Sequence, residues 1–306
     1  MLISICICTH KRPAQLEFLL GRIARLDFPG GPTECEVVVV DNDLGFSSQP
    51  VLLDWVSKLP IALRYENLPK PNISLARNRV VAMARGEFLL LIDDDQYPDG
   101  PNWVHQLLKT HRDTQAQVVF GPILPVFDER SPQWIQDGRF FDQPSYESGA
   151  PVPLEAVRGG NVLIHRSCFQ AFEPPFDESY GKTGAEDTLF FQELYRRGFQ
   201  SAWCAEAVIH ETVPFDRANT RWLTQRSYRI GQTWIRTTLH GTSGMGWALN
   251  WSLLLLRSGV LLVLSLLLTV VNYPFSIIRG FYWFRKVAAQ VGKLSSLFGR
   301  SYHEYR

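Results

Sequence analysis

The sequence FLLLIDDDQYP, residues 88–98, places three carboxylates directly after an apolar run. The run FLLLI is typical of a buried strand, and Asp93, Asp94 and Asp95 follow at its end. Like charges this close together repel one another and lose hydration when they are buried. We therefore expect a positive group, such as a bound cation, to hold the three carboxylates in place.

Strand and helix patterns alternate on the N-terminal side of this stretch. The predicted strands are residues 3–9, 35–43, 61–66 and 87–95, and the predicted helices are residues 12–26, 48–59 and 74–86, the last of them ending at Gly86. Strands that alternate with helices imply a Rossmann-like α/β fold, with a mostly parallel sheet covered by flanking helices. Ligands of such sheets bind at the carboxyl ends of the strands, where Thr9, Asp41 and the three aspartates fall.

The spacing of the aspartates indicates a metal site. Asp93 and Asp95 stand at i and i+2, which puts both carboxylates on one side of an extended strand end. Hard oxygen ligands in this arrangement suit Mg²⁺ or Mn²⁺, which also bind phosphates and stabilise a leaving diphosphate. The alternative is an acidic loop that caps the next helix or forms a solvated turn.

Composition excludes several classes of protein. The 306 residues carry a formal charge of +1, so no bulk basic field points to a nucleic-acid partner. The five cysteines are scattered and lack Cys-x-x-Cys spacing, as expected of reduced core residues in a cytosol-facing protein. The N-terminal sequence MLISICICTHKRP predicts a first strand and not a signal peptide.

The order of several blocks resembles that of family 2 glycosyltransferases with the GT-A fold, from Ile3 to about Gly231. CTHKRP is similar to the opening block of that family, VVVVDND to its uridine-contacting strand end, and ISLARNRVVAMARGEFLLLIDDD to its Ala-Arg-Asn helix and Asp-x-Asp motif. GGNVLIHRSCF, FDESYGKTGAEDTLFFQELYRRGF and AVIH complete the pattern.

The resemblance implies roles for the residues at the strand ends. Thr9, Arg12 and Asp41 would contact the base and ribose of a nucleotide sugar, expected to be a UDP-sugar, and Arg77 would lie near the nucleotide. The sugar-diphosphate and its metal would be held by Asp93, Asp94 and Asp95.

Two departures from the family pattern bear on this reading. Cys8, His10 and Lys11 stand where Pro, Tyr and Asn are commoner, which leaves the base contact of residue 10 open. The processive signature Gln-x-x-Arg-Trp is absent, because RWLTQRSYRIGQTW has related residues at another spacing. We therefore expect the transfer of one sugar per encounter.

Glu186 and Asp187 precede an amphipathic stretch and fall in its first turn. Acidic residues favour a helix N-terminus, so the pair read alone indicates a helix start. By the resemblance the pair contains the general base. Asp187 would deprotonate the acceptor hydroxyl in a single inverting displacement, while Glu186 would orient the acceptor or hold a backbone amide.

Three further features have competing readings. His210 resembles a histidine that points toward the metal in related enzymes, but a lone histidine after a strand is commonly structural, and Glu211 competes with it. Arg226 and Arg229 follow Trp222 on one helix face. They would clamp a diphosphate, contact lipid headgroups or simply belong to an exposed helix. Gly159 and Gly160 would allow close approach to the donor sugar or simply form a turn.

The composition changes near residue 244, so we expect a catalytic domain at residues 1–243 and a membrane-associated region at residues 244–306. Within the first, residues 1–100 would bind the nucleotide sugar and residues 101–243 the acceptor. The apolar run at residues 258–278 is long enough to cross a bilayer, although Arg257 leaves open a re-entrant hairpin of residues 247–256 and 259–278. VAAQVGKLSSLFGR suits an amphipathic helix on the membrane surface.

Nucleotide sugars are cytosolic, so we expect the catalytic domain at the cytoplasmic face of the inner membrane, with a lipid-linked or oligosaccharide acceptor in envelope polysaccharide assembly. Two alternatives belong to other classes. A sugar-nucleotide pyrophosphorylase would need a Gly-rich N-terminal loop, which THKRP lacks. A catalytically silent glycan-binding or scaffold subunit would keep the same fold.

Overall fold

The computed structural model describes residues 1–300 and 302. The chain forms two compact units: residues 1–125 with 143–211 make up the first, and residues 126–142 with 212–300 and 302 the second. The sequence placed residues 212–243 in the catalytic domain, whereas they belong by compactness to the second unit. The division of function at residue 243 stays a prediction.

The first unit contains a seven-stranded sheet in the order β3-β2-β1-β4-β8-β6-β9. Its strands are β1 (Ile3–Thr9), β2 (Cys35–Asp41), β3 (Ala62–Asn67), β4 (Phe88–Asp93), β6 (Val118–Phe120), β8 (Val162–His165) and β9 (Ser201–Trp203). Strands β3, β2, β1 and β4 are parallel, and β8 is antiparallel to both β4 and β6. The prediction of a mostly parallel sheet is confirmed.

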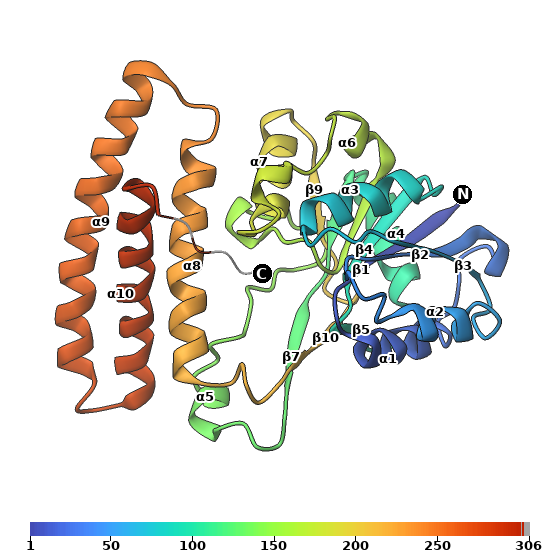
Figure 1. Cartoon of the computed structure of the whole chain (residues 1–306), viewed down its shortest axis with the longest axis horizontal. Helices are drawn as coiled ribbons and strands as arrows, with labels where there is room; N and C mark the ends of the chain where they lie inside the picture. The colour runs from blue at the N-terminus through green and yellow to red at the C-terminus, as the bar shows by residue number, and fades with distance from the viewer. Residues whose placement is uncertain (301, 303–306) are drawn as a thin grey trace. The chain divides into compact units, whose positions relative to one another are not determined.

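Helices cover both faces of this sheet (Figure 1). One face carries α1 (Pro13–Ile23), α2 (Gln49–Trp55) and α4 (Trp103–Thr114), and the other carries α3 (Ile73–Met83), α6 (Arg166–Gln170) and α7 (Glu186–Arg196). The two faces have separate apolar clusters because neighbouring strand residues, such as Val37 and Val38, point to opposite sides. Both faces of the sheet are therefore buried, as the apolar runs predicted.

Helix α3 ends at Met83, three residues before the predicted end at Gly86. Gly86 instead passes close to the first strand, where an added Cβ would lie 2.6 Å from the Ser4 backbone nitrogen. The glycine is required by this approach of two backbone segments and not by a helix end.

A three-stranded sheet has the order β5-β10-β7, with β5 at Gln96–Pro98, β7 at Ile123–Phe127 and β10 at Ile209–Val213. Strand β10 runs antiparallel to β5, and this pairing sets His210 opposite Tyr97 and Glu211 opposite Gln96. Asp94 and Asp95 themselves form the turn between β4 and β5, so β10 is brought to the carboxyl end of β4.

The second unit is built on three long helices, α8 (Thr220–Leu239), α9 (Gly244–Asn272) and α10 (Ile277–Leu297), together with the short α5 (Gln133–Asp137). An added Cβ on Gly231 would lie 2.0 Å from the Ala289 carbonyl, and one on Gly292 would lie 2.0 Å from the Tyr228 carbonyl. These two glycines thus let α8 and α10 approach closely. The stretch predicted to lie on a membrane surface is the second half of α10 and packs on α8.

Helix α9 is continuous through Arg257, so the hairpin of residues 247–256 and 259–278 that the sequence left open is not formed. One arginine does not interrupt a helix whose backbone hydrogen bonds are all internal. The helix also ends before Pro274, six residues short of the predicted end of the apolar run. Within the described part of the chain, α9 is the one helix long and apolar enough to cross a membrane, with a mean hydropathy of 2.4.

Candidate active site

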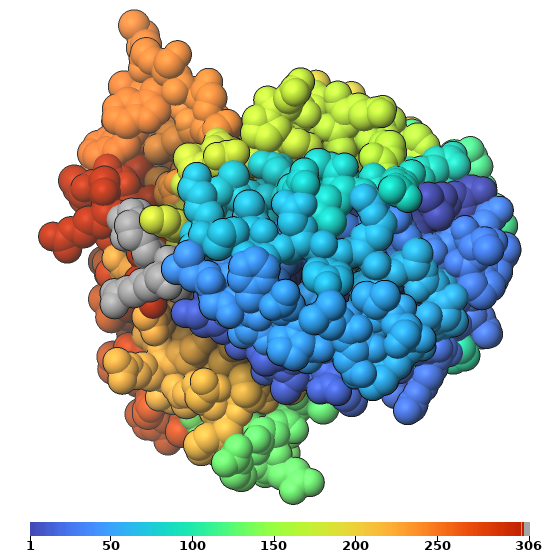
Figure 2. Space-filling view, turned by 45° about the vertical axis from the view of Figure 1, so that its right-hand side comes forward, coloured from blue at the N-terminus to red at the C-terminus, as the bar shows by residue number. Residues whose placement is uncertain are grey.

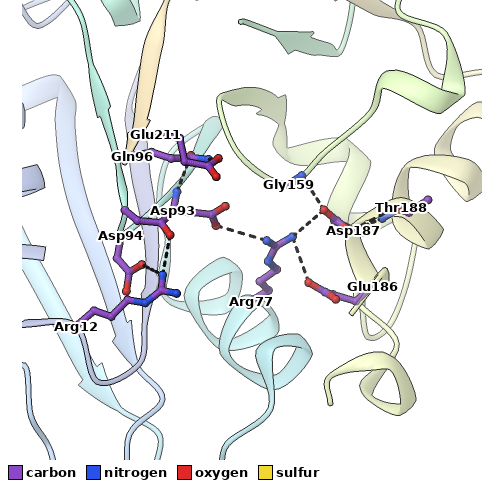
Figure 3. Close-up of polar contacts among 11 residues, drawn as sticks. Arg12, Arg77, Asp93, Asp94, Gln96, Gly159, Glu186, Asp187, Thr188 and Glu211 are labelled. Carbon is purple, nitrogen blue, oxygen red and sulfur yellow. Dashed lines mark hydrogen bonds and ion pairs between the residues drawn. The ribbon is translucent and has the colours of Figure 1, made fainter. Parts of the chain in front are cut away.

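The three aspartates at the end of β4 are held by arginines and a threonine. Thr9 Oγ1 donates to Asp94 Oδ2 at 2.8 Å. Arg12 Nη1 lies 2.7 Å from Asp94 Oδ1 and 2.9 Å from Asp95 Oδ2, so one guanidinium nitrogen bridges both carboxylates. Asp93 points instead toward Arg77, as Figure 3 shows. The structure therefore supplies two cationic side chains as the positive groups that the sequence required.

Arg77 joins the two halves of the site. From α3 its Nη2 lies 3.6 Å from Asp93 Oδ1, and its Nη1 lies 3.5 Å from Glu186 Oε1 and 3.8 Å from Asp187 Oδ2. Burial by itself would lower the pKa of Arg77, but these carboxylates raise it above its ordinary value. The guanidinium is thus a fixed positive charge between the aspartate cluster and the start of α7 (Figure 3).

Burial raises the pKa of Asp93 to about 7. Arg77 opposes this shift, whereas the negative charges of Asp95 and Glu211 add to it. The Asp93 side chain keeps 42% of its surface exposed, so water and ligands can reach it. A carboxylate in this position gains stability from any further cation that binds beside it.

The N-terminus of α7 orients Asp187. Asp187 Oδ2 accepts the Gly159 backbone N–H at 2.8 Å, and its Oδ1 accepts the Thr188 backbone N–H at 2.7 Å. These bonds fix the carboxylate, while its second lone pairs remain available to accept a proton. An added Cβ on Gly159 would lie 2.0 Å from Arg77 Nη1, so this glycine makes room for the guanidinium.

Glu186 lies beside Asp187 but differs from it in burial. Its residue surface is 4% exposed, and its Oε2 has no hydrogen-bond partner in the described part of the chain. Burial raises the pKa of Glu186 to about 7, and the charge of Arg77 only partly opposes this. Of the two carboxylates, Asp187 is the more exposed and so the better placed to meet a substrate.

Strand alternation separates the two candidates on β10. His210 Nε2 lies 2.8 Å from Asp99 Oδ1, and its ring centre lies 5.3 Å from that of Tyr97. Glu211 Oε2 accepts from Gln96 Nε2 at 3.2 Å, and Gln96 Oε1 in turn accepts the Asp93 backbone N–H at 3.1 Å. Glu211 is thus linked to the aspartate cluster, so the geometry favours it over His210, whose metal role stays a prediction.

The residues expected to contact the nucleotide form hydrogen bonds or ion pairs within the protein. Asp41 is 2% exposed, and its oxygens accept the backbone N–H groups of Asp43 and Ser48, each at 3.0 Å. It therefore shapes the loop after β2. Thr9 and Arg12 likewise hold Asp94 in place, and the nucleotide contacts of these three residues stay predictions.

The sequence analysis did not single out Asn42, Asn67 or Gln96 as site residues. The side-chain oxygens of Asn42 and Asn67 are buried at the carboxyl ends of β2 and β3, without a hydrogen-bond partner among the described residues. Unpaired buried acceptors at this edge suit the N–H of a nucleotide base. Gln96 was a further signal, because it follows the aspartates directly and its amide links Asp93 to Glu211.

Arg226 and Arg229 lie on α8 in the second unit. The Arg226 guanidinium lies over the rings of Phe141 and Trp222, at 5.8 and 5.2 Å from their centres. Their assignment to a donor diphosphate stays a prediction.

The residues at the end of β4 fit a divalent cation that brings further ligands with it. Among residues 1–300 and 302, no group of three or more His, Cys, Asp or Glu side chains is arranged to hold a metal ion. Asp95 and Glu211 nevertheless lie close enough for their charges to act on Asp93, and carboxylate oxygens suit Mg²⁺ or Mn²⁺. Such ions keep water and phosphate ligands, so a metal bound together with a diphosphate fits better than a metal alone.

Residues 4–172 match the model of Glycosyl transferase family 2. The chain belongs to this family. It is 34% identical over 261 residues to the succinoglycan biosynthesis protein ExoM of Rhizobium meliloti, an alignment that covers 84% of this chain and 82% of ExoM.

Two solved structures share the fold of this glycosyltransferase. The mannosyltransferase PcManGT from Pyrobaculum calidifontis, in complex with GDP-Man and Mn²⁺, has a TM-score of 0.65 at 17% identity and covers 95% of this chain and 86% of its own. TarS 1–349 of S. aureus, in complex with UDP-GlcNAc, has a TM-score of 0.58 at 16% identity and covers 99% and 93%. The predicted GT-A fold class is confirmed.

Proposed function

We propose that this glycosyltransferase moves one sugar from a UDP-sugar to a lipid-linked glycan, with inversion at the anomeric carbon, in the assembly of a cell-surface polysaccharide. The observation that carries the proposal is the contact of Arg77 with Asp93 on one side and with Glu186 and Asp187 on the other. A donor at the aspartates and an acceptor at α7 would meet across this one guanidinium.

The donor site would use the carboxyl edge of the parallel strands. Asn42 and Asn67 offer acceptors to the base, and Arg77 offers a buried positive charge to the diphosphate. The UDP-GlcNAc complex of TarS supports a UDP-sugar, whereas the GDP-Man complex of PcManGT keeps GDP-sugars as the competing class.

A divalent metal held by Asp93, Asp95 and Glu211 would supply positive charge to the departing diphosphate. Arg12 fixes Asp94 and Asp95, so the carboxylates already lie in one place before the donor arrives. Preorganised charges of this kind cost little reorganisation at the moment of reaction.

Asp187 would act as the general base. Its two backbone hydrogen bonds fix the carboxylate, and Arg77 Nη1 lies 3.8 Å from its Oδ2. It would take the proton of the acceptor hydroxyl as that oxygen attacks the anomeric carbon. The bond between the anomeric carbon and the diphosphate oxygen breaks in the same step, which gives inversion in one displacement. Glu186, buried beside it, would hold Arg77 and position the acceptor side of the site.

Membrane association fits this function. Helix α9 would anchor the chain, and ExoM, which this chain resembles over most of its length, is a succinoglycan biosynthesis protein. Because nucleotide sugars are cytosolic, we place the catalytic unit at the cytoplasmic face of the inner membrane. A lipid-linked acceptor would be concentrated at that surface.

The test is a calorimetric titration of the purified chain with UDP, GDP and dTDP, each with Mn²⁺ and then with EDTA. Metal-dependent binding of UDP alone supports the proposed donor. Preferred binding of GDP overturns the UDP assignment, and no binding of any nucleotide favours the silent-subunit alternative.

The role of Asp187 as general base is tested with the variant Asp187→Asn. Asp187→Asn should lower turnover at least about a hundredfold, the usual scale of general-base catalysis, while UDP affinity stays within about twofold. Near-normal turnover of Asp187→Asn would show that the base lies elsewhere.

A further inference from the structure

The second unit carries two adjoining cavities that the catalytic residues of the first unit do not use. The larger has a volume of about 670 Å³ and lies between α8 and α10. The smaller, of about 140 Å³, is lined by Trp222, Gln225, Arg226, Arg229 and Tyr302. Gln225 and Tyr302 line both cavities and hydrogen-bond to each other, so the two cavities adjoin at this pair, and we call them together the groove.

The large end of this groove is mostly apolar. Phe284, Val287, Ala288 and Val291 of α10 face Tyr228 of α8 across it. Phe284 and Val291 are 40% and 41% exposed, which is a large apolar exposure for two residues on one helix face. The volume falls within the roughly 300–1,000 Å³ of sites that bury small ligands.

The small end is cationic. Arg226 and Arg229 stand three residues apart on α8 and so lie on one face of the helix. The rings of Phe141 and Trp222 beneath the Arg226 guanidinium hold it in a defined place. Arg221 lines the apolar part. Two guanidinium groups this close suit the oxygens of a phosphate or diphosphate.

We propose that this groove binds the lipid-phosphate end of the acceptor, with the first isoprenoid units between α8 and α10 and the diphosphate at Arg226 and Arg229. A glycan alone would leave the apolar wall without a partner, whereas a prenyl diphosphate matches both ends. Helix α9 packs on α10 in the same unit and is apolar enough to enter a membrane, where such lipids reside. The inference rests on the proposed function, because it gives the lipid-linked acceptor a site.

The experiment titrates the full chain in lipid nanodiscs with farnesyl diphosphate and with inorganic diphosphate, and corrects for partition into empty discs. UDP with Mn²⁺ is titrated in parallel as the readout of the donor site. We expect farnesyl diphosphate to bind at least about tenfold more tightly than inorganic diphosphate, because only the former occupies the apolar cavity.

Two variants separate the ends of the groove. Val291→Trp adds bulk at a half-exposed position, so it should weaken farnesyl diphosphate at least about tenfold and leave inorganic diphosphate unchanged. The double variant Arg226→Ala and Arg229→Ala should weaken both ligands. Val260→Trp, on the exposed face of α9, and Arg236→Ala, which lines neither cavity, are the matched controls and should bind as the wild type does.

Equal binding of farnesyl and inorganic diphosphate, or normal binding by Val291→Trp, would overturn the inference. So would a dimer that Val291→Trp dissociates in light scattering, because a second copy of the chain would then fill the groove. If the wild type binds UDP but not farnesyl diphosphate, the groove assignment fails and the donor proposal stands. If it binds farnesyl diphosphate but not UDP, the groove assignment stands and the proposed donor fails.

Discussion

Replacing Arg77 with methionine tests the central charge of the site. The side chain keeps its approximate length and loses its positive charge, so Asp93, Glu186 and Asp187 lose the cation that lies 3.5–3.8 Å from them. Of these pairs, the one between Arg77 and Glu186 is buried on both sides, and removing one partner of a buried ion pair costs about 3–5 kcal/mol, because the remaining charge is left buried. In a unit of this size that corresponds to a melting temperature lower by about 6–20 °C.

The loss should depend on pH in a defined direction. In the wild type the pKa values of Asp93 and Glu186 are both raised to about 7, although Arg77 partly opposes each rise. Without Arg77 both pKa values should rise further. The destabilisation should then be complete above these pKa values, at about pH 9, and should shrink as pH falls through 7 toward 5, where the carboxyls are neutral in both proteins.

The assay is a thermal melt of wild type and variant at about pH 9 and about pH 5.5. Arg79→Met is the matched control on the same helix. Arg79 pairs with Glu66 at the surface, where an ion pair contributes less than about 1 kcal/mol. Equal destabilisation of Arg77→Met at both pH values, or a loss no larger than that of the control, would refute the reasoning.

Three further predictions follow from the same geometry. Gly159→Ala should lower turnover at least about tenfold while Gly100→Ala does not, because only the first adds a Cβ within 2.0 Å of a guanidinium; steady-state kinetics measure this. Glu211→Gln should weaken metal-dependent UDP binding more than His210→Gln, and the reverse order in calorimetry would restore the histidine as the ligand. Asp41→Ala should lower the free energy of unfolding by about 3 kcal/mol, because two buried amides lose their acceptor; a loss of UDP affinity at unchanged stability in urea titration would instead make it a ligand contact.

The strands and the edge at which the site lies were predictable because they depend on local patterns. The apolar runs that became β1, β2 and β4 are buried on both faces, and continuous runs of that kind occur in covered parallel sheets. Thr9 and Asp93 end their strands at adjacent places because β1 pairs with β4 in parallel. The start of α7 at Glu186, soon after Gly184, was predictable for the same reason, because it also depends on a local pattern.

Side-chain partners were not predictable in the same way, because they depend on residues far apart in the sequence. Arg12 and Asp94 lie 82 positions apart and form an ion pair. The motif read along the chain would assign Arg12 to a nucleotide instead. The continuity of α9 through Arg257 is likewise set by its backbone hydrogen bonds, whereas hydropathy alone suggested a break.

The sequence by itself determined the family, the mostly parallel sheet and the acidic edge, since these follow from block order, apolar periodicity and residue type. Only the tertiary structure decided that Arg77 stands between Asp93 and the Glu186–Asp187 pair, that Gly159 makes room for it, and that Glu211 rather than His210 joins the aspartates. The physical reason is the distance along the sequence over which the two kinds of interaction act. Hydrophobic patterns act between near neighbours, whereas the charges of a site are brought together from α3, β4, α7 and β10 by the packing of the whole unit.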